Sequence, residues 1–192
     1  STNSTFASAS VTGKLLLSGK IEITTELGKI EIQLNTLGSH NVRNALAASA
    51  VALAAGVGLE KIKEGLESFS PVNGRMQAKK LDPNHTLIDD SYNANPDSVR
   101  AAIDALKQSG NLSWLVLGDM GEVGDQGPEF HREVGAYAAE QGITKLFALG
   151  AQCELAVQGF DAAMKNSAAA NAMHFSDMDS LISQVRDAFY AQ

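Results

Sequence analysis

The sequence predicts an α/β protein, in which a small strand-and-helix part is followed by a parallel sheet. The opening segments carry apolar residues at every second position, as at Ile21 and Ile23, which is typical of half-buried strands. Beyond the turn signal Asp82–Asn84, strand and helix patterns alternate, and repeated βα units build a parallel sheet with helices on its faces. We therefore expect a boundary at this turn, which gives domains 1–82 and 83–192.

Three strands and two helices are expected in the first part. Leu27-Gly28 supplies a hairpin turn between the second and third strands. The strands are Lys14–Leu17, Lys20–Thr25 and Lys29–Leu34, and the helices are Val42–Ala55 and Leu59–Phe69.

The first of these helices is almost entirely Ala, Leu and Val, with no charged residue after Arg43, and Gly56 and Gly58 end it. A helix that is apolar all round is buried. We expect Val42–Ala55 to be covered by the three strands and the amphipathic second helix, or by an intermolecular contact.

The second part is expected to begin after a strand or extended segment at Met76–Leu81. Ligands of parallel sheets bind at the carboxyl ends of the strands, so the loops after Asp89, Leu117 and Leu149 are where we expect a site. The expected strands are His85–Asp89, Trp114–Leu117, Lys145–Leu149 and Met173–Phe175, and the helices are Asp97–Ser109, Glu129–Gln141, Gln152–Lys165 and Met178–Tyr190.

Composition narrows the class of protein. The formal net charge of −7 argues against nucleic acid as a partner, since a basic patch is the usual footprint. Cys153 is the only cysteine, which favours a reducing, cytoplasmic setting. No apolar run approaches the length of a membrane span. The chain starts without Met and without a signal-peptide pattern, so we expect it to be a cut piece of a longer protein.

The segment Asp89–Pro96 concentrates hydrogen-bonding side chains after a strand. One interpretation is a plain helix entry, with Asn95 or Asp97 as the cap and Pro96 in the first turn. That interpretation does not account for two aspartates, a tyrosine and two asparagines in one loop. Their density favours a ligand with many polar atoms.

The segment Leu117–Gly124 is a second strand-end loop. Its glycines allow close approach to a ligand, and its acidic residues would repel phosphate and favour an ammonium group. A flexible acidic surface loop is the alternative. A Gly-x-Gly-x-x-Gly dinucleotide fingerprint is absent from it.

Two weaker candidates lie earlier. Asn41 and Asn44 share a helix face, and an amide can match the edge of adenine, although Asn41 could simply be the N-cap. Arg75 is either a solvated surface residue or a phosphate contact. His85, His131 and His174 have no metal-ligand spacing, so no metal site is expected, and His131 is expected to be a surface or capping residue.

Four segments carry these motifs in order along the chain: Gly38–Ala48, Gly74-Arg75, Asp89–Pro96 and Leu117–Gly124. As an ordered set they resemble the motifs of the Mur ligase family. Asp89–Pro96 and Leu117–Gly124 are similar to the motifs of its D-alanyl-D-alanine-adding members. The resemblance implies that 1–82 ends a central ATP-binding domain and that 83–192 is a Rossmann-like ligase domain lacking its last strand.

The resemblance also implies an activity. Such ligases use ATP and Mg²⁺ to turn the carboxylate of UDP-N-acetylmuramoyl-tripeptide into an acyl phosphate, which the amine of D-alanyl-D-alanine attacks, in peptidoglycan precursor synthesis. Asn41 and Asn44 would contact adenine, Asp90 the ribose hydroxyls and Arg75 the phosphates. These four side chains are expected to converge on one groove between the domains. An intact monomer is expected.

Substrate contacts follow from the same resemblance. They would come from Tyr92, Asn93 and Asn95, which line the cleft, and from Asp119 and Glu122, which would orient the dipeptide amine.

The chain departs from the family in ways that bear on catalysis. It has no Gly-x-x-x-x-Gly-Lys-[Ser/Thr] phosphate loop, lacks the carbamylated lysine that helps to hold Mg²⁺, and stops before the Lys-Gly-Ser-Arg motif. We therefore expect no certain catalytic residue here and no ligation by this chain alone. The alternatives are a non-catalytic nucleotide-binding module and another acid–amino-acid ligase such as folylpolyglutamate synthase, against which the Tyr92–Asn95 tetrapeptide counts.

Overall fold

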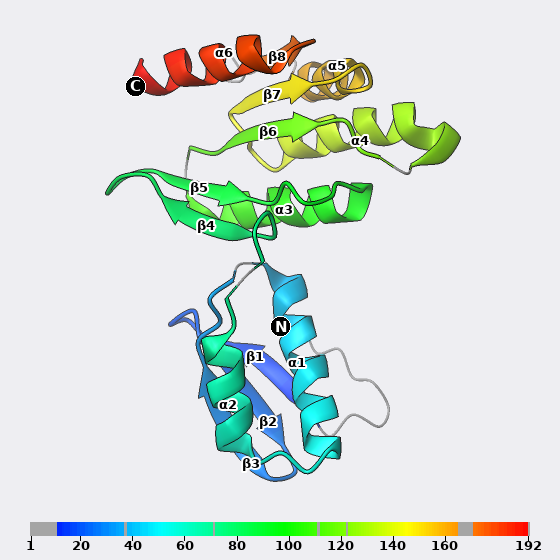
Figure 1. Cartoon of the computed structure of the whole chain (residues 1–192). Coiled ribbons are helices and arrows are strands. Elements are labelled where there is room, and N and C mark those ends of the chain that lie inside the picture. Colours follow the sequence, from blue (N-terminus) through cyan, green and yellow to red (C-terminus); the bar gives the residue numbers. More distant parts are fainter. Residues whose placement is uncertain are drawn as a thin grey trace. The chain divides into compact units, whose positions relative to one another are not determined.

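The computed structural model describes residues 11–36, 38–70, 72–110, 112–121, 123–164 and 171–191. It contains two compact units, one ending at Asp89 and one beginning at Asp90. Figure 1 labels the helices and strands of both units. The domain boundary expected at Asp82–Asn84 stays a prediction.

The first unit opens with an antiparallel sheet in the order β1-β2-β3. Its strands are β1 (Thr12–Leu15), β2 (Ile21–Thr25) and β3 (Gly28–Ile32). The three strands predicted from period-two patterning are confirmed. Thr25 pairs with Gly28, so the hairpin loop is one residue earlier than expected, and Gly28 is in the left-handed region at φ 127°.

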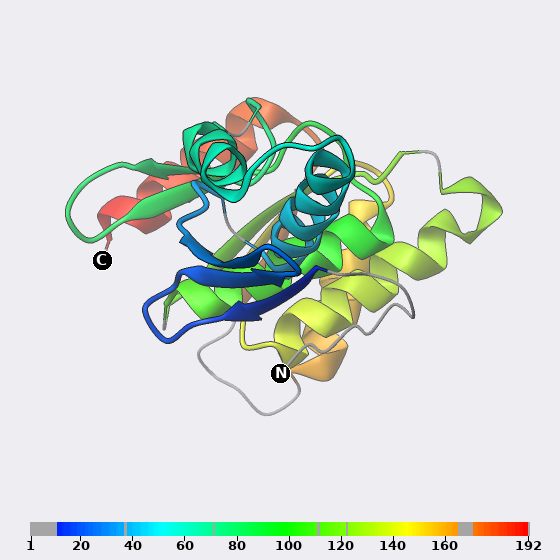
Figure 2. The same cartoon turned by 90° about the horizontal axis from the view of Figure 1, so that it is seen from below.

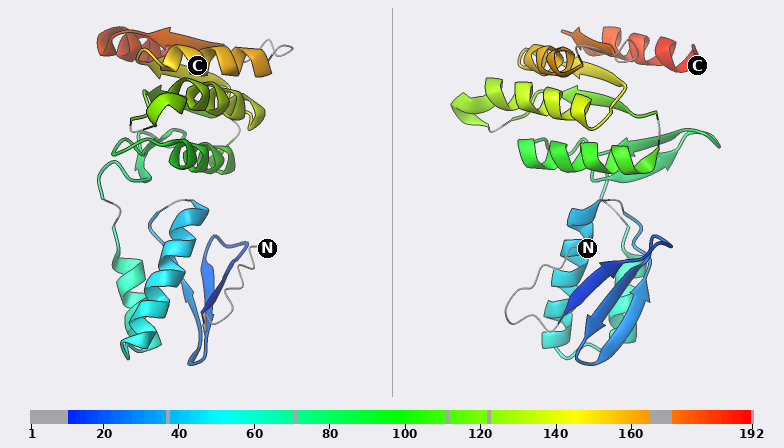
Figure 3. Two further views of the ribbon diagram at one scale, coloured as in Figure 1. Left: turned by 90° about the vertical axis from the view of Figure 1, so that its right-hand side faces the viewer. Right: turned by 180° about the vertical axis from the view of Figure 1, so that it is seen from behind.

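Two helices, α1 (Ser39–Ala54) and α2 (Leu59–Ser68), lie on one face of this sheet (Figure 3). Val42 and Leu46 of α1 pack on the isoleucines of the strands. The prediction that α1 is buried all round is wrong for its outer face, where Val51 is 71% exposed. One small sheet and one neighbouring helix cover only one side of a helix this apolar.

A two-stranded antiparallel sheet closes the first unit. It pairs β4 (Gln77–Lys80) with β5 (Thr86–Asp89). We predicted β5 as a strand of the parallel sheet, and that prediction is wrong for the described residues, in which β5 pairs with β4. The reason is the tight turn between them, where the Asp82 carboxylate accepts hydrogen bonds from the backbone N–H groups of Asn84 and His85.

The second unit contains a parallel sheet in the order β6-β7-β8. Helices α4 and α5 lie on one side of its strands and α6 on the other (Figure 2). The α/β class and the parallel pairing of these strands are confirmed. In chain order the elements are α3 (Pro96–Ser109), β6 (Trp114–Gly118), a 3-10 turn (Gly124–Gln126), α4 (Gly127–Glu140), β7 (Lys145–Leu149), α5 (Cys153–Ala163), β8 (Asn171–Phe175) and α6 (Met178–Tyr190).

Helices α4 and α5 pack closely through two glycines. A Cβ on Gly135 would collide with the carbonyl oxygen of Ala156, and a Cβ on Gly159 would collide with that of Arg132. The close approach brings Val134 and Phe160 into one core with the inner residues of β6 and β7. It also fixes where α4 and α5 begin beside the carboxyl ends of those strands. Among the described residues, no helix is long and apolar enough to cross a membrane.

Candidate functional site

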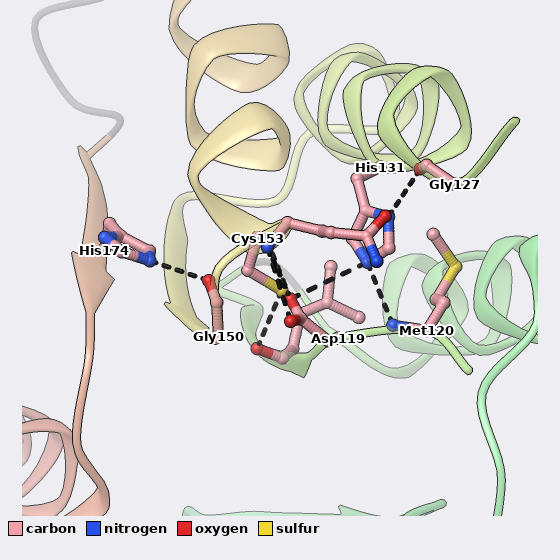
Figure 4. Close-up of polar contacts among 9 residues, drawn as sticks. Asp119, Met120, Gly127, His131, Gly150, Cys153 and His174 are labelled. Atoms are coloured by element: carbon pink, nitrogen blue, oxygen red, sulfur yellow. Dashed lines mark hydrogen bonds and ion pairs between the residues drawn. The ribbon is translucent and has the colours of Figure 1, made fainter. Parts of the chain in front are cut away.

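The loop after β6 is joined to the start of α5 by the Asp119 carboxylate (Figure 4). Its Oδ1 accepts the backbone N–H of Cys153 at 2.8 Å and that of Gln152 at 3.1 Å. These N–H groups belong to the first turn of α5, which has no intrahelical acceptors for them. Asp119, in the loop after β6, therefore caps the start of α5. Its negative charge lies at the amino-terminal end of that helix, where the helix dipole favours it.

Gly150 makes room for this carboxylate. Its φ of 116° lies in the left-handed region, and a Cβ there would collide with the side chain of Asp119. The same residue is held from the other side, because His174 Nε2–H donates to the Gly150 carbonyl oxygen at 2.8 Å. The loops after β6 and β7 thus form one bonded edge.

His131 lies beneath this edge and is 0% exposed. Its Nε2 accepts the backbone N–H of Met120 at 2.9 Å, and its Nδ1–H donates to the Gly127 carbonyl oxygen at 2.7 Å. An N–H can only donate and a carbonyl can only accept, so these partners select the neutral tautomer with the proton on Nδ1. The prediction of a surface or capping residue is wrong, because the first turn of α4 points this ring inward under the loop.

Cys153 completes the cluster as a buried thiol. Its Sγ–H donates to the Leu117 carbonyl oxygen at 3.6 Å. Burial, reinforced by the nearby Asp119 charge, raises the pKa of the Cys153 thiol to about 12. The thiol therefore stays protonated at neutral pH and is not an activated nucleophile there.

Asp119, His131 and Cys153 place their ligand-type atoms within 4.8 Å of one another, and this invites a test as a metal site. The Met120 N–H occupies the lone pair of His131 Nε2, and the Cys153 thiol donates to the Leu117 carbonyl oxygen. The contacts therefore fit a hydrogen-bonded cluster better than a metal site. Sequence spacing missed it, since the three residues come from a loop and two helices.

The loop between β5 and α3 uses its side chains differently. Asn95 Oδ1 accepts the Ser98 N–H at 2.9 Å and Ser98 Oγ accepts the Asn95 N–H at 3.0 Å, so the predicted cap of α3 is confirmed as a capping box. Tyr92 is 65% exposed, and Asn93 is also exposed. Asp90 is half-buried.

The candidates of the first unit lie on α1 and in the loop before β4. Asn41 Nδ2 donates to Thr36 Oγ1 at 3.0 Å. The alternative that Asn41 is the N-cap is wrong, because Gly38 occupies that position. Asn44, three residues after Asn41 on the same helix, is exposed. Arg75, in the loop before β4, is also exposed.

Of the remaining predicted residues, Glu122 lies outside the described residues. Convergence of Asn41, Asn44, Arg75 and Asp90 on one groove stays a prediction.

Comparison with known proteins supplies the family. Residues 74–190 match the sequence profile of the Mur ligase glutamate ligase domain. The chain belongs to the Mur ligase family.

Its similarity to relatives of this family extends beyond the matched region. A UDP-N-acetylmuramoyl-tripeptide–D-alanyl-D-alanine ligase of Haemophilus influenzae is 51% identical over 110 residues, which are 57% of this chain and 24% of the relative. The Escherichia coli K12 protein of the same name is 34% identical over 164 residues, 85% of this chain and 34% of the relative.

A crystal structure of MurF from Acinetobacter baumannii has a similar fold, with a TM-score of 0.81 at 32% identity. It matches 95% of this Mur ligase chain and 39% of its own. This chain thus spans about a quarter to two fifths of the length of each of these three proteins. The matched family region starts at Gly74, so it includes Arg75 and every candidate of the second unit.

Proposed function

We propose that this chain is the carboxy-terminal part of an ATP-dependent ligase that adds D-alanyl-D-alanine to UDP-N-acetylmuramoyl-tripeptide in peptidoglycan precursor synthesis. The observation that carries the proposal is the loop Asp90–Asn95, a dense polar segment at the end of β5 with Tyr92 and Asn93 exposed. It occurs in a chain whose Haemophilus and Escherichia relatives are named for this activity. We further propose a cytoplasmic monomer, where ATP and the soluble precursor are available.

In this proposal ATP is held by residues of both units. Asn41 and Asn44 contact adenine, Asp90 accepts from the ribose hydroxyls and Arg75 meets the phosphates. The exposed positions of Asn44 and Arg75 support these roles, because a ligand contact needs an accessible side chain. Tyr92 and Asn93 contact the substrates.

The roles of Asn95 and Asp119 are narrower. The side-chain oxygen of Asn95 accepts the helix cap bond, which leaves its amide N–H groups for the substrate. The carboxylate of Asp119 accepts two N–H groups of α5, so it acts on the dipeptide amine only through its remaining lone pairs. Glu122 is proposed to share that task.

Mg²⁺ would neutralise the transferring phosphoryl group when bound. The described residues do not fit it, because the one compact group of possible ligands among them offers a thiol and an imidazole beside a single carboxylate, whereas Mg²⁺ takes oxygen ligands. We therefore assign no metal ligand to these residues. Their proposed contribution is to hold nucleotide and dipeptide in line for amine attack on the acyl phosphate.

The test measures phosphate release with ATP, UDP-N-acetylmuramoyl-tripeptide and D-alanyl-D-alanine. A full-length ligase in which this chain replaces the matching segment of the Escherichia coli relative is expected to release phosphate only when the dipeptide is present. The isolated chain is expected to release none, because it lacks a phosphate loop. Phosphate release that requires a folate and glutamate, and not the tripeptide and the dipeptide, would indicate a folylpolyglutamate-type ligase and overturn the proposal.

A further inference from the structure

The loop at the carboxyl end of β6 is constrained at successive positions. The Asp119 carboxylate is bonded to α5, the Met120 side chain is buried in the core, and the Met120 N–H is bonded to His131. On either side of these anchors, Gly118 and Gly121 are exposed, and a Cβ on either glycine would meet open space. The loop is thus rigidly held yet presents bare backbone to solvent.

His131 is the anchor that packing alone does not explain. The ring is fully buried, and Oδ1 of Asp119 lies 3.9 Å from its Nε2. Placing a polar ring there costs free energy unless its nitrogens are bonded, and both are, one to the loop and one to α4. The ring therefore links the position of the Met120 backbone to the start of α4.

We propose that His131 is a positioning residue for the ligation reaction. It holds the backbone of Gly118–Gly121 in the conformation that receives the incoming amino-dipeptide at the end of β6. Ligands of parallel sheets bind at this edge, and acceptance of an amine in line with an acyl phosphate depends on sub-ångström placement. This inference rests on the proposed function and assigns the dipeptide side of that site to the β6 loop.

The kinetic test compares three variants in the full-length ligase that carries this chain. His131→Leu removes both bonds, and we expect the KM for D-alanyl-D-alanine to rise about tenfold or more while the KM for ATP stays within about twofold. His131→Gln keeps one donor and one acceptor and is expected to recover most of the dipeptide affinity. Val134→Ala, a fully buried change on the same helix, is the control for lost core packing.

A purely structural role predicts a different pattern. If Val134→Ala, at an equal fall in Tm, raises the dipeptide KM as much as His131→Leu does, or if His131→Leu raises both KM values alike, the positioning role is overturned. Failure of His131→Gln to improve on His131→Leu would also count against it, since the Gln amide retains the hydrogen-bonding groups.

Amide hydrogen exchange on the 192-residue chain separates this inference from the proposed function. His131→Leu is expected to speed exchange of the Met120 amide about tenfold or more relative to Val134→Ala, because the buried acceptor is lost. Unchanged Met120 protection would show that His131 does not hold the loop. If the wild-type ligase instead forms no product with D-alanyl-D-alanine, the proposed function fails and the dipeptide half of this inference is overturned with it.

Discussion

The loops after β5 and β6 contain similar residues at the ends of strands, but they use them in opposite ways. After β6, the polar groups of Asp119 and Met120 are bonded to α5 and α4. After β5, Asn95 caps its own helix, while the side chains of Tyr92 and Asn93 are exposed. The first loop is built to stay in place, and the second presents side chains to solvent.

The difference shows that polar residues at a strand end are not by themselves ligand contacts. A helix that begins nearby exposes N–H groups without intrahelical acceptors, and a carboxylate within reach will satisfy them first. Asp119 meets such a helix start in α5. We therefore expect mutation of Asp119 to lower stability and disturb the loop after β6, and mutation of the exposed Asn93 after β5 to act mainly on binding.

The largest effect is expected for Gly150→Ala. Gly150 and Gly142 both have positive φ, but only at Gly150 would a Cβ collide with Asp119. Gly142→Ala should lower the free energy of unfolding by about 1 kcal/mol through backbone strain alone, and Gly150→Ala by about 3 kcal/mol because the cap of α5 is also displaced. Urea unfolding measures both, and equal losses would show that Asp119 does not depend on Gly150.

Asp119→Ala and Asp90→Ala test the contrast between the loops directly. Asp119→Ala should lower the free energy of unfolding by about 2 kcal/mol, because two N–H groups of α5 lose their acceptor. Asp90→Ala should weaken ATP binding by the full-length ligase roughly ten- to a hundredfold, because a charge-assisted ribose bond is lost. Calorimetry of ATP binding and thermal unfolding give the two readouts. Full ATP affinity in the Asp90 variant would remove the ribose role.

Asn95 and Asn93 lie two residues apart in the loop after β5 but are used differently, since only Asn95 caps α3. Asn95→Ala should cost about 1 kcal/mol of stability through loss of the α3 cap, and Asn95→Ser should recover most of it. Asn93→Ala should leave the unfolding transition unchanged and raise the substrate KM by roughly two- to tenfold, the value of a neutral hydrogen bond. A stability loss at Asn93 equal to that at Asn95 would contradict the distinction.

The smallest effect concerns alkaline pH. The folded pKa of Cys153 is raised from 9.0 to about 12 by burial, so the thiol ionises more readily in the unfolded chain. The stability is fully present below pH 9 and is lost as pH rises toward 12. Between pH 8 and 9.5 the free energy of unfolding should fall by roughly 0.8 kcal/mol, and Cys153→Ala should remove most of that decline. Tyr137 donates to Asp104 and also has a raised pKa, but its ordinary value of 10.0 lies above this window. An equal decline in both proteins would assign it to another group.

Much of the fold could be predicted because it depends on local patterns. Period-two apolar residues predict β1 to β3, and alternating strand and helix patterns predict the β6-β7-β8 sheet. The cap of α3 follows from Asn95-Pro96, since capping acts between residues within one turn. The ordered motifs were also enough to indicate the Mur ligase family.

Features that join distant parts of the chain could not be predicted in this way. Pairing of β5 with β4, the exposed outer face of α1 and the buried position of His131 each depend on what packs against them. Nothing near Asp119 in the sequence indicates that its partners are the N–H groups of Gln152 and Cys153.

Local patterns along the chain thus predict most helices and strands, the β6-β7-β8 sheet and the family. Which polar residues are bonded internally depends on how the helices pack in three dimensions. The physical reason is that helix caps and strand periods are set by near neighbours, whereas the cluster of Asp119, His131 and Cys153 exists only after α4 and α5 approach through Gly135 and Gly159.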